Sequence, residues 1–157
     1  MDIIQKARKF AKEEYEKNAP GHQWDHVERV LEKALEIARN LENVDFEALV
    51  LAVIFHDISY ASYETHVKES IKVAERFLRE TGYPRDRIEL IKEIMLNHST
   101  PHREKVGDAR LIEGKIIYDA DKSILITTTE AYEKYYRRLY FDVTKRLVKR
   151  QLQNQNP

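Results

Sequence analysis

The 157-residue sequence contains no cysteine. Disulfide bonds and thiolate ligands are therefore excluded, and any metal site must be built from His, Asp or Glu. Glycine and proline are scarce, with four residues each, and they fall between segments of helical periodicity. No apolar run reaches the length of a membrane-spanning helix. The sequence therefore predicts a helical protein that does not cross a membrane.

An excess of charge of either sign is also missing. The chain has 27 basic and 27 acidic side chains, so its formal net charge is zero. This balance argues against a strong overall field for nucleic acid or an anionic membrane, although it allows local patches of one sign. The N-terminal residues lack the apolar region of a signal peptide, so we expect a cytoplasmic location.

The length and composition predict one domain with its own core. Apolar residues make up 42% of the chain, and we find no internal repeat and no low-complexity linker. No segment alternates convincingly with the period of two that a strand requires. We therefore predict a single all-α domain over residues 1–151, a bundle of about six or seven helices, followed by a polar tail over residues 152–157.

Apolar residues recur at helical spacing in seven segments, separated by turn-forming residues. Asp45 is the predicted N-cap of the third segment, and residues 99–108 are expected to form a polar loop. The expected helices cover residues 2–18, 22–41, 45–57, 65–80, 85–97, 109–121 and 123–150.

His56 and Asp57 are the residues that first indicate chemistry. They directly follow the apolar run of residues 48–55, where a carboxylate beside an imidazole is costly unless a metal, a polar network or a catalytic task compensates. Adjacent residues cannot point the same way from a helix interior, but at a helix end both can reach one ion.

Two further residues favour a metal. His26 lies thirty residues upstream on a predicted helix, and Asp121 lies downstream, after the apolar stretch of residues 111–118. Imidazoles and carboxylates that converge from different helices into a bundle core form a common kind of metal site.

Several motifs in this order resemble the HD-domain superfamily of metal-dependent phosphohydrolases, in particular its small single-domain members. The resemblance covers roughly residues 22–125. Its motifs are His22-Gln23-Trp24-Asp25-His26-Val27-Glu28-Arg29-Val30, Leu51-Ala52-Val53-Ile54-Phe55-His56-Asp57-Ile58, His66-Val67-Lys68-Glu69-Ser70, the helix from Ile91 to His98, and Glu113-Gly114-Lys115-Ile116-Ile117-Tyr118-Asp119-Ala120-Asp121-Lys122.

The resemblance implies an HD-domain fold and one divalent metal, such as Mn, Ni, Fe, Co, Mg or Zn. The implied ligands are His26, His56, Asp57 and Asp121. Asp119 is then expected to cap a helix or to support a ligand.

The residues expected to act on a substrate form a second set. His66 and His98 are expected either to hold a second metal or to contact the phosphate and donate a proton. Lys122 and Arg29 are expected to offset phosphate charge. The predicted catalytic residues are therefore Asp57, His98, His66, Lys122 and Arg29.

Other polar residues are expected to lie at the edge of this site. His22 and His102 are predicted at the pocket mouth, and Arg103 is predicted to be a solvated surface cation. The sequence departs from the family at Gln23, where Asp is common, and after Lys122, where an Arg-Leu-Asp run and a glycine are absent. These departures concern substrate specificity.

Three functions follow from these residues and from the resemblance. The first is a metal-dependent phosphohydrolase acting on a nucleotide or another phosphate ester. The second is a di-iron oxygenase of the same fold, with all six ligands from His26 to Asp121 in use. The third is a non-catalytic, metal-stabilised module that binds a nucleotide or a partner.

The C-terminal tyrosines and arginines allow two interpretations. Tyr132, Tyr135, Tyr136 and Tyr140 lie near Arg137 and Arg138, a combination that can contact nucleic acid. Their spacing is helical and acidic residues are interspersed, so core packing or a homodimer surface is the favoured prediction, and the nucleic-acid signal is weak.

Overall fold

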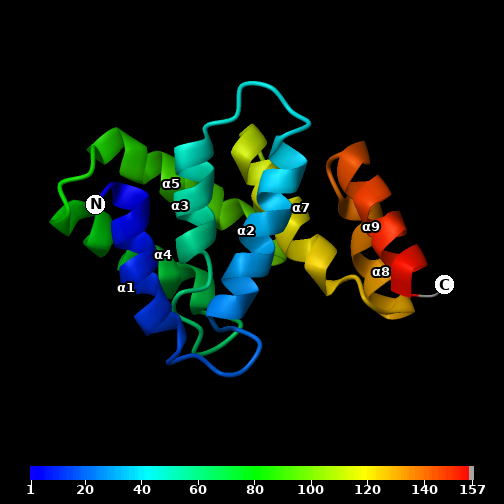
Figure 1. Cartoon of the computed structure of the whole chain (residues 1–157), viewed down its shortest axis with the longest axis horizontal. Coiled ribbons are helices and arrows are strands. Elements are labelled where there is room, and N and C mark those ends of the chain that lie inside the picture. The colour runs from blue at the N-terminus through cyan, green and yellow to red at the C-terminus, as the bar shows by residue number, and fades with distance from the viewer. Residues whose placement is uncertain (156–157) are drawn as a thin grey trace.

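The computed structural model describes residues 1–155, and this part of the chain is all-α, as predicted (Figure 1). It contains nine α-helices and one short 3-10 helix, more than the six or seven expected. The elements are α1 (Ile3–Tyr15), α2 (Trp24–Ala38), α3 (Phe46–Phe55), α4 (His66–Glu80), α5 (Arg85–Asn97), α6 (Thr100–Val106), α7 (Ile112–Leu125), α8 (Thr129–Tyr135), η1 (Tyr136–Arg138) and α9 (Asp142–Gln155).

Helix α3 forms the centre of the bundle. It contacts α1, α2, α4, α5 and α7, and its residues from Leu51 to Phe55 are all buried. A helix that is apolar on every side is stable only when it is enclosed in this way. Asp45 caps its first turn, as predicted, by accepting a hydrogen bond from the Ala48 N–H at 3.0 Å. Because α3 ends inside the bundle, His56 and Asp57, which directly follow it, are buried.

The helices around α3 are amphipathic, and each turns one face to the core. Helix α2, for example, buries Val27, Val30, Ala34, Ile37 and Ala38, which recur at intervals of one turn. It packs along α7, and α7 packs in turn on α5. Among residues 1–155, we find no helix that is both long and apolar enough to cross a membrane.

Helix α6 corrects the prediction of a loop over residues 99–108. The Ser99 hydroxyl accepts a hydrogen bond from the His102 N–H at 3.2 Å, and Pro101 lies in the first turn. A capping serine and a proline at the first helical positions both favour a helix start. The local signals were therefore present, but the polar composition of the segment concealed them.

The predicted helix over residues 123–150 is wrong, because the chain turns twice within it. Helix α7 runs on to Leu125, and Thr128 then caps α8 by accepting a hydrogen bond from the Ala131 N–H at 3.1 Å. After the 3-10 turn, α9 begins at Asp142 and continues to Gln155. Residues 152–155 of the expected polar tail are thus helical, and residues 156–157 lie outside the described part of the chain.

Residues 129–155, here called the C-terminal hairpin, lie beside the bundle rather than within it (Figure 1). Leu139 and Val148 of the hairpin form a small core with Ile126, which directly precedes it, and Tyr132, Tyr135 and Tyr136 pack against this core. This arrangement agrees with the core-packing interpretation of the tyrosines. The homodimer stays a prediction.

Candidate metal centre

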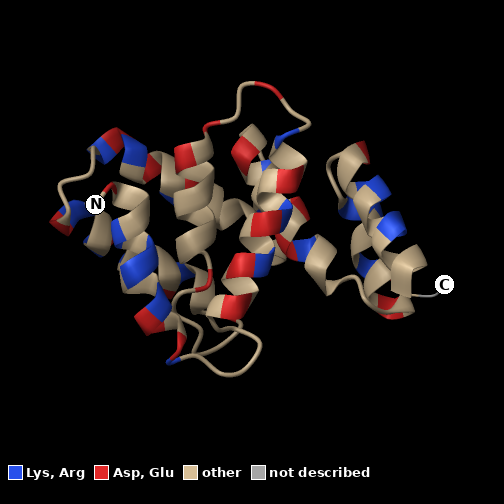
Figure 2. Cartoon of the chain, viewed as in Figure 1, with Lys and Arg blue, Asp and Glu red and all other residues tan. Residues whose placement is uncertain are grey.

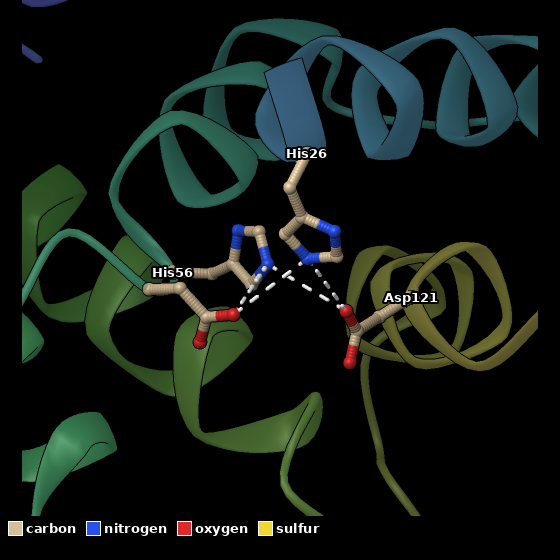
Figure 3. A group of neighbouring side chains, drawn as sticks. His26, His56 and Asp121 are labelled. Carbon is tan, nitrogen blue, oxygen red and sulfur yellow. Dashed lines mark ion pairs between the residues drawn. The ribbon is translucent and has the colours of Figure 1, made fainter. Parts of the chain in front are cut away.

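The four predicted metal ligands lie close together, on α2, on α7 and directly after α3. Figure 3 shows three of them, His26, His56 and Asp121. His26 Nε2 lies 3.4 Å from Asp121 Oδ1 and 3.7 Å from Asp57 Oδ2. His56 Nε2 lies 3.4 Å from Asp57 Oδ2 and 3.7 Å from Asp121 Oδ1. All four residues are buried, and their ligand atoms lie within 4.8 Å of one another. One ion could therefore contact all of them.

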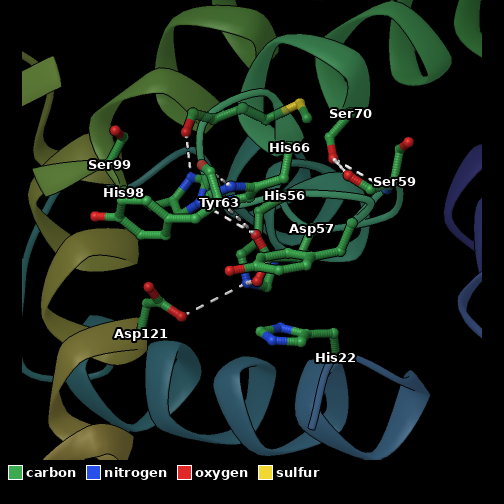
Figure 4. Close-up of polar contacts among 12 residues, drawn as sticks. His22, His56, Asp57, Ser59, Tyr63, His66, Ser70, His98, Ser99 and Asp121 are labelled. Carbon is green, nitrogen blue, oxygen red and sulfur yellow. Dashed lines mark hydrogen bonds and ion pairs between the residues drawn. The ribbon is translucent and has the colours of Figure 1, made fainter. Parts of the chain in front are cut away.

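A second group uses the other oxygen of the same aspartate (Figure 4). Asp57 Oδ1 lies 3.3 Å from His66 Nε2 and 3.3 Å from His98 Nε2. His66 is the first residue of α4, and His98 directly follows α5. The carboxylate of Asp57 therefore faces two adjacent groups of ligands, one through each oxygen.

Three of the histidines share one supporting contact. His56 Nδ1 lies 2.6 Å from the Val53 carbonyl oxygen, and His66 Nδ1 lies 2.7 Å from the Tyr63 carbonyl oxygen. His98 Nδ1 contacts the Met95 carbonyl oxygen in the same way. Because a carbonyl only accepts, each Nδ1 carries a hydrogen, and the Nε2 of each ring faces the centre, where its lone pair can bind a cation when the imidazole is neutral.

Tyr15 and Asn18 support the His56-Asp57 turn through hydrogen bonds, and neither was predicted to be a site residue. Tyr15 Oη donates a hydrogen bond to the Ile54 carbonyl at 2.6 Å and accepts one from the Asp57 N–H at 3.2 Å. Asn18 Nδ2 donates to the Asp57 carbonyl at 3.1 Å. Their distance from the turn along the chain left no local signal of this role.

The segment after Asp57 is fixed by stacking as well as by hydrogen bonds. The ring of Tyr60 stacks on His22, with centroids 3.6 Å apart and planes 10° apart, and its centroid lies 4.5 Å from that of His66. The Ser59 N–H donates to Ser70 Oγ at 3.0 Å. Tyr60 and Ser70 therefore support this side of the site. Neither was predicted to be a site residue, although Ser70 ends one of the motifs found in the sequence.

The charges of the cluster depend on one another. Burial opposes a charged His56, but Asp57 and Asp121 outweigh it and raise the pKa of His56 to about 9. Burial likewise opposes a charged Asp57, yet the nearby His56 holds the pKa of Asp57 well below its usual range. Burial also opposes a charged Asp121, and the nearby Lys122 holds the pKa of Asp121 well below its usual range. The carboxylates are thus ionised and ready to bind a cation.

The residues present fit a divalent metal ion. The buried atoms His56 Nε2, Asp57 Oδ1 and His98 Nε2 make no hydrogen bond with any residue among 1–155. Buried polar atoms without partners are costly, and a cation would satisfy all three. Imidazole and carboxylate ligands suit several divalent metals, so the donor set does not select one of them.

The two predicted cations differ in position. Lys122 is buried, and its Nζ lies 2.8 Å from Asp121 Oδ2. Arg29 lines the edge of a cavity beside the cluster, where its side chain is 57% exposed and lies 3.8 Å from Asp25. Lys122 is therefore placed beside the metal ligands, and Arg29 is placed at the rim.

Asp119 points away from the cluster and caps another helix. Its carboxylate accepts hydrogen bonds from the backbone N–H of Tyr140 at 2.8 Å and of Phe141 at 3.1 Å, just before α9 begins. Of the two roles considered for Asp119, the structure shows the helix cap.

Arg103 corrects the prediction of a solvated cation. Its guanidinium lies 4.7 Å from the ring centroid of Tyr118 and 4.0 Å from that of Tyr140, and it donates to Asp108 Oδ1 at 2.9 Å. His102 does not line the cavity, whereas His22 does.

The metal cluster opens on a cavity of about 670 Å³. His26, Asp57, His66, His98, Asp121 and Lys122 all line it, together with Tyr60, Tyr63 and Tyr135. Its volume is in the range of small-molecule sites. Another hollow of about 580 Å³ lies between α1 and α2, and none of the His and Asp residues of the two groups lines it. The cavity of about 670 Å³ is therefore the candidate for the active site.

Comparisons with known structures give the fold. A predicted HD superfamily hydrolase from an uncultured Thermotogales bacterium is 20% identical over 92% of this chain and 82% of its own, with a TM-score of 0.69. An HD-superfamily hydrolase from Bacillus thuringiensis is 21% identical over 96% and 91%, with a TM-score of 0.68. Bacillus subtilis YpgQ in complex with ADP is 17% identical over 96% and 87%, with a TM-score of 0.66.

The sequence comparisons give the family. A search of curated proteins found no match. A family model described as the HD domain matches residues 24–124, which include every residue of both groups. The match and the buried cluster of His and Asp support a metal-dependent hydrolase in general. Because the matched segment covers well over half of the sequence, the chain belongs to the HD domain family.

Proposed function

We propose that the protein is a metal-dependent phosphohydrolase that acts on a nucleotide or another phosphate ester. The observation that carries this proposal is the convergence of His26, His56, Asp57 and Asp121 at a cavity that also contains a buried lysine. A divalent ion held there would lower the pKa of a water molecule and polarise a phosphoryl oxygen.

The side chains have distinct roles in this proposal. Asp57 orients the attacking water and accepts its proton, because its carboxylate lies between both groups of ligands. His98 or His66 protonates the leaving oxygen. Lys122 offsets phosphate charge, since mutual attraction with Asp121 raises the pKa of Lys122 despite burial and keeps it protonated. Arg29 offsets charge from the rim.

A nucleotide is the favoured substrate class for two reasons. The cavity of about 670 Å³ has aromatic side chains, Tyr63 and Tyr135, on which a base can stack. In addition, a structure of similar fold, YpgQ, was solved in complex with ADP.

The test is a screen of metal-loaded protein. Purified protein would be stripped with a chelator, reloaded with Mn, Co, Ni, Mg, Fe or Zn, and incubated with nucleoside mono-, di- and triphosphates and simple phosphate esters. We expect phosphate or pyrophosphate release that is lost in His56→Ala and Asp57→Ala. No release from any substrate with any metal would rule out a phosphohydrolase.

The second group of ligands favours one alternative, a di-iron oxygenase. Asp57 faces His66 and His98 through the oxygen that the first group does not use, as expected for a carboxylate that bridges two irons. Iron content and oxygen consumption by anaerobically iron-loaded protein distinguish the two functions. One equivalent of metal per chain with full phosphohydrolase activity would eliminate the oxygenase.

A non-catalytic module remains the third candidate. If the metal only stabilises the bundle, the double variant His56→Ala, Asp57→Ala should lose metal and still bind nucleotide. Loss of nucleotide binding together with the metal would count against it.

A further inference from the structure

A second, smaller cavity of about 350 Å³ adjoins the metal-site cavity. Thr100 and Tyr135 line both cavities and therefore form the boundary between them. On the far side, three basic side chains line the smaller cavity: Lys134, Arg137 and Arg138. A ligand that extends past Tyr135 from the metal centre would thus meet cations.

The charges of this smaller cavity leave one arginine without an ion pair. Glu104 and Glu133 also line it, but Glu104 is occupied by Arg138, whose Nη1 lies 3.1 Å from its carboxylate. Lys134 Nζ lies 5.1 Å from the Tyr135 ring centroid. Arg137 is exposed and forms no ion pair with any residue among 1–155. Its guanidinium is available to an anion.

The surroundings of the smaller cavity also have a positive net charge. The C-terminal hairpin carries seven Lys and Arg side chains against three Asp and Glu, although the whole chain is neutral. Figure 2 shows this concentration of basic residues on α8, η1 and α9. The local field therefore attracts an anion towards the smaller cavity, while the rest of the molecule has the opposite net charge.

The boundary between the cavities also has an unused polar group. The Thr100 hydroxyl is buried and has no hydrogen-bond partner among residues 1–155, although Thr100 lines both cavities. A hydroxyl can donate to a ligand oxygen as well as accept a hydrogen bond. It is a suitable contact for a sugar or phosphate oxygen that passes from one cavity to the other.

We propose that the smaller cavity is a subsite for a second phosphate of the substrate. The substrate would then be a nucleotide with phosphates on both sides of its sugar, such as a nucleoside 3′,5′-bisphosphate. One phosphate lies at the metal centre, the sugar lies near Thr100 and Tyr135, and the other phosphate meets Arg137. This inference rests on the proposed phosphohydrolase function and narrows its substrate class.

The experiment compares AMP with adenosine 3′,5′-bisphosphate in the metal-loaded protein. For the unaltered protein, we expect a KM about tenfold lower for the bisphosphate, the effect of one additional charge-assisted contact. Arg137→Gln should remove this preference and leave the KM for AMP unchanged. Arg146→Gln is the matched control, because Arg146 is an exposed arginine of the same hairpin that lines neither cavity.

The outcomes separate the subsite from the function. Turnover of AMP with no preference for the bisphosphate would overturn the subsite and leave the phosphohydrolase intact. An equal effect of Arg137→Gln and Arg146→Gln would also overturn it, since only the overall field would then matter. If neither compound is turned over, the proposed function fails. In that case, calorimetry measures the binding of both compounds to the unaltered protein, Arg137→Gln and Arg146→Gln. The subsite is overturned if the unaltered protein binds the bisphosphate no more tightly than AMP.

Discussion

Asp57 is the residue on which both groups of ligands depend. Its Oδ2 faces His26 and His56, and its Oδ1 faces His66 and His98, each at less than 4 Å. An asparagine in its place would keep the shape and lose the charge that holds the cluster together. In the proposed function, the number of metals and the route of the proton therefore both depend on this carboxylate.

The first prediction concerns pH and metal removal. Because burial is outweighed by Asp57 and Asp121, the pKa of His56 in the metal-free protein is about 9, above the ordinary 6.5. Protonated His56 therefore stabilises the metal-free fold below pH 6.5, and this stabilisation is lost as the pH rises through 9. A bound metal needs the neutral imidazole, so its affinity should increase by up to about tenfold per pH unit over the same interval.

Thermal unfolding at a series of pH values measures this effect. We expect the difference in Tm between metal-loaded and chelator-treated protein to grow from pH 6.5 to pH 9. A difference that stays constant or shrinks over that interval would contradict the placement of His56 among the ligands.

The second prediction concerns Tyr15, which is fully buried. Tyr15→Phe removes the hydroxyl that joins the Ile54 carbonyl to the Asp57 N–H, so both groups are left buried without that partner. The free energy of unfolding should fall by about 1–3 kcal/mol. The metal affinity should fall roughly 10–100-fold, as for other groups that orient a ligand.

Denaturant unfolding and metal titration check this prediction, with Tyr132→Phe as the control. Tyr132 packs in the small C-terminal core, and its hydroxyl makes no hydrogen bond with another residue among 1–155. The control should change neither quantity appreciably. Unaltered metal affinity in Tyr15→Phe would mean that the turn keeps its shape without the hydroxyl.

At the scale of the elements, the site depends on how closely α5 and α7 approach. Helix α5 positions His98 at its end, and α7 carries Asp121 within its last turns. Gly114 lies at their contact, where a β-carbon would come within 2.0 Å of Asn97 Oδ1. Only a residue without a side chain allows this approach.

The third prediction follows from that contact. Gly114→Ala forces Asn97 and its neighbour His98 to move, so we expect a loss of about 1–3 kcal/mol in unfolding free energy and weaker metal binding. The double variant Gly114→Ala, Asn97→Ala removes the two closest atoms, Oδ1 and Cγ, keeps the Cβ of residue 97 at 2.9 Å, and should recover part of the stability. Denaturant unfolding of both variants measures this. If Gly114→Ala keeps the free energy of unfolding of the unaltered protein, the helices separate at little cost.

At the scale of the whole molecule, the bundle and the C-terminal hairpin are joined mainly through α7. Asp119 on α7 accepts the N–H groups of Tyr140 and Phe141 ahead of α9, and Arg103 lies against Tyr118 and Tyr140. The hairpin in turn contributes Tyr135 to the metal-site cavity. The attachment of the hairpin therefore affects the shape of the site.

The fourth prediction tests this attachment. Asp119→Ala leaves two backbone N–H groups without their acceptor and should cost about 1–2 kcal/mol. Amide hydrogen exchange should increase in residues 129–155 while α3 stays protected, because the hairpin has its own small core. Asp142→Ala is the control, since it removes an acidic residue from the same helix end without those contacts. Equal exchange in both variants would show that the cap does not hold the hairpin.

The sequence by itself determined the helical class and the family, and it predicted four ligands that the fold brings together. Helical periodicity and caps such as Asp45 are local signals, and they placed α3 and its end at His56 correctly. The motifs around His26, His56 and Asp121 are specific enough to indicate one metal centre, although they lie on three separate helices. Local signals failed where polar composition or helical spacing continued through a turn, as at α6 and at residues 126–128.

Only the tertiary structure decided which distant groups meet. Tyr15 and Asn18 support Asp57 from about forty residues away, and Arg103 lies between two tyrosines instead of in solvent. The two oxygens of Asp57 and the cavity beside Tyr135 are likewise products of packing. A chain pattern records which faces of a helix are apolar, but the contacts between helices depend on how all of those faces are buried together.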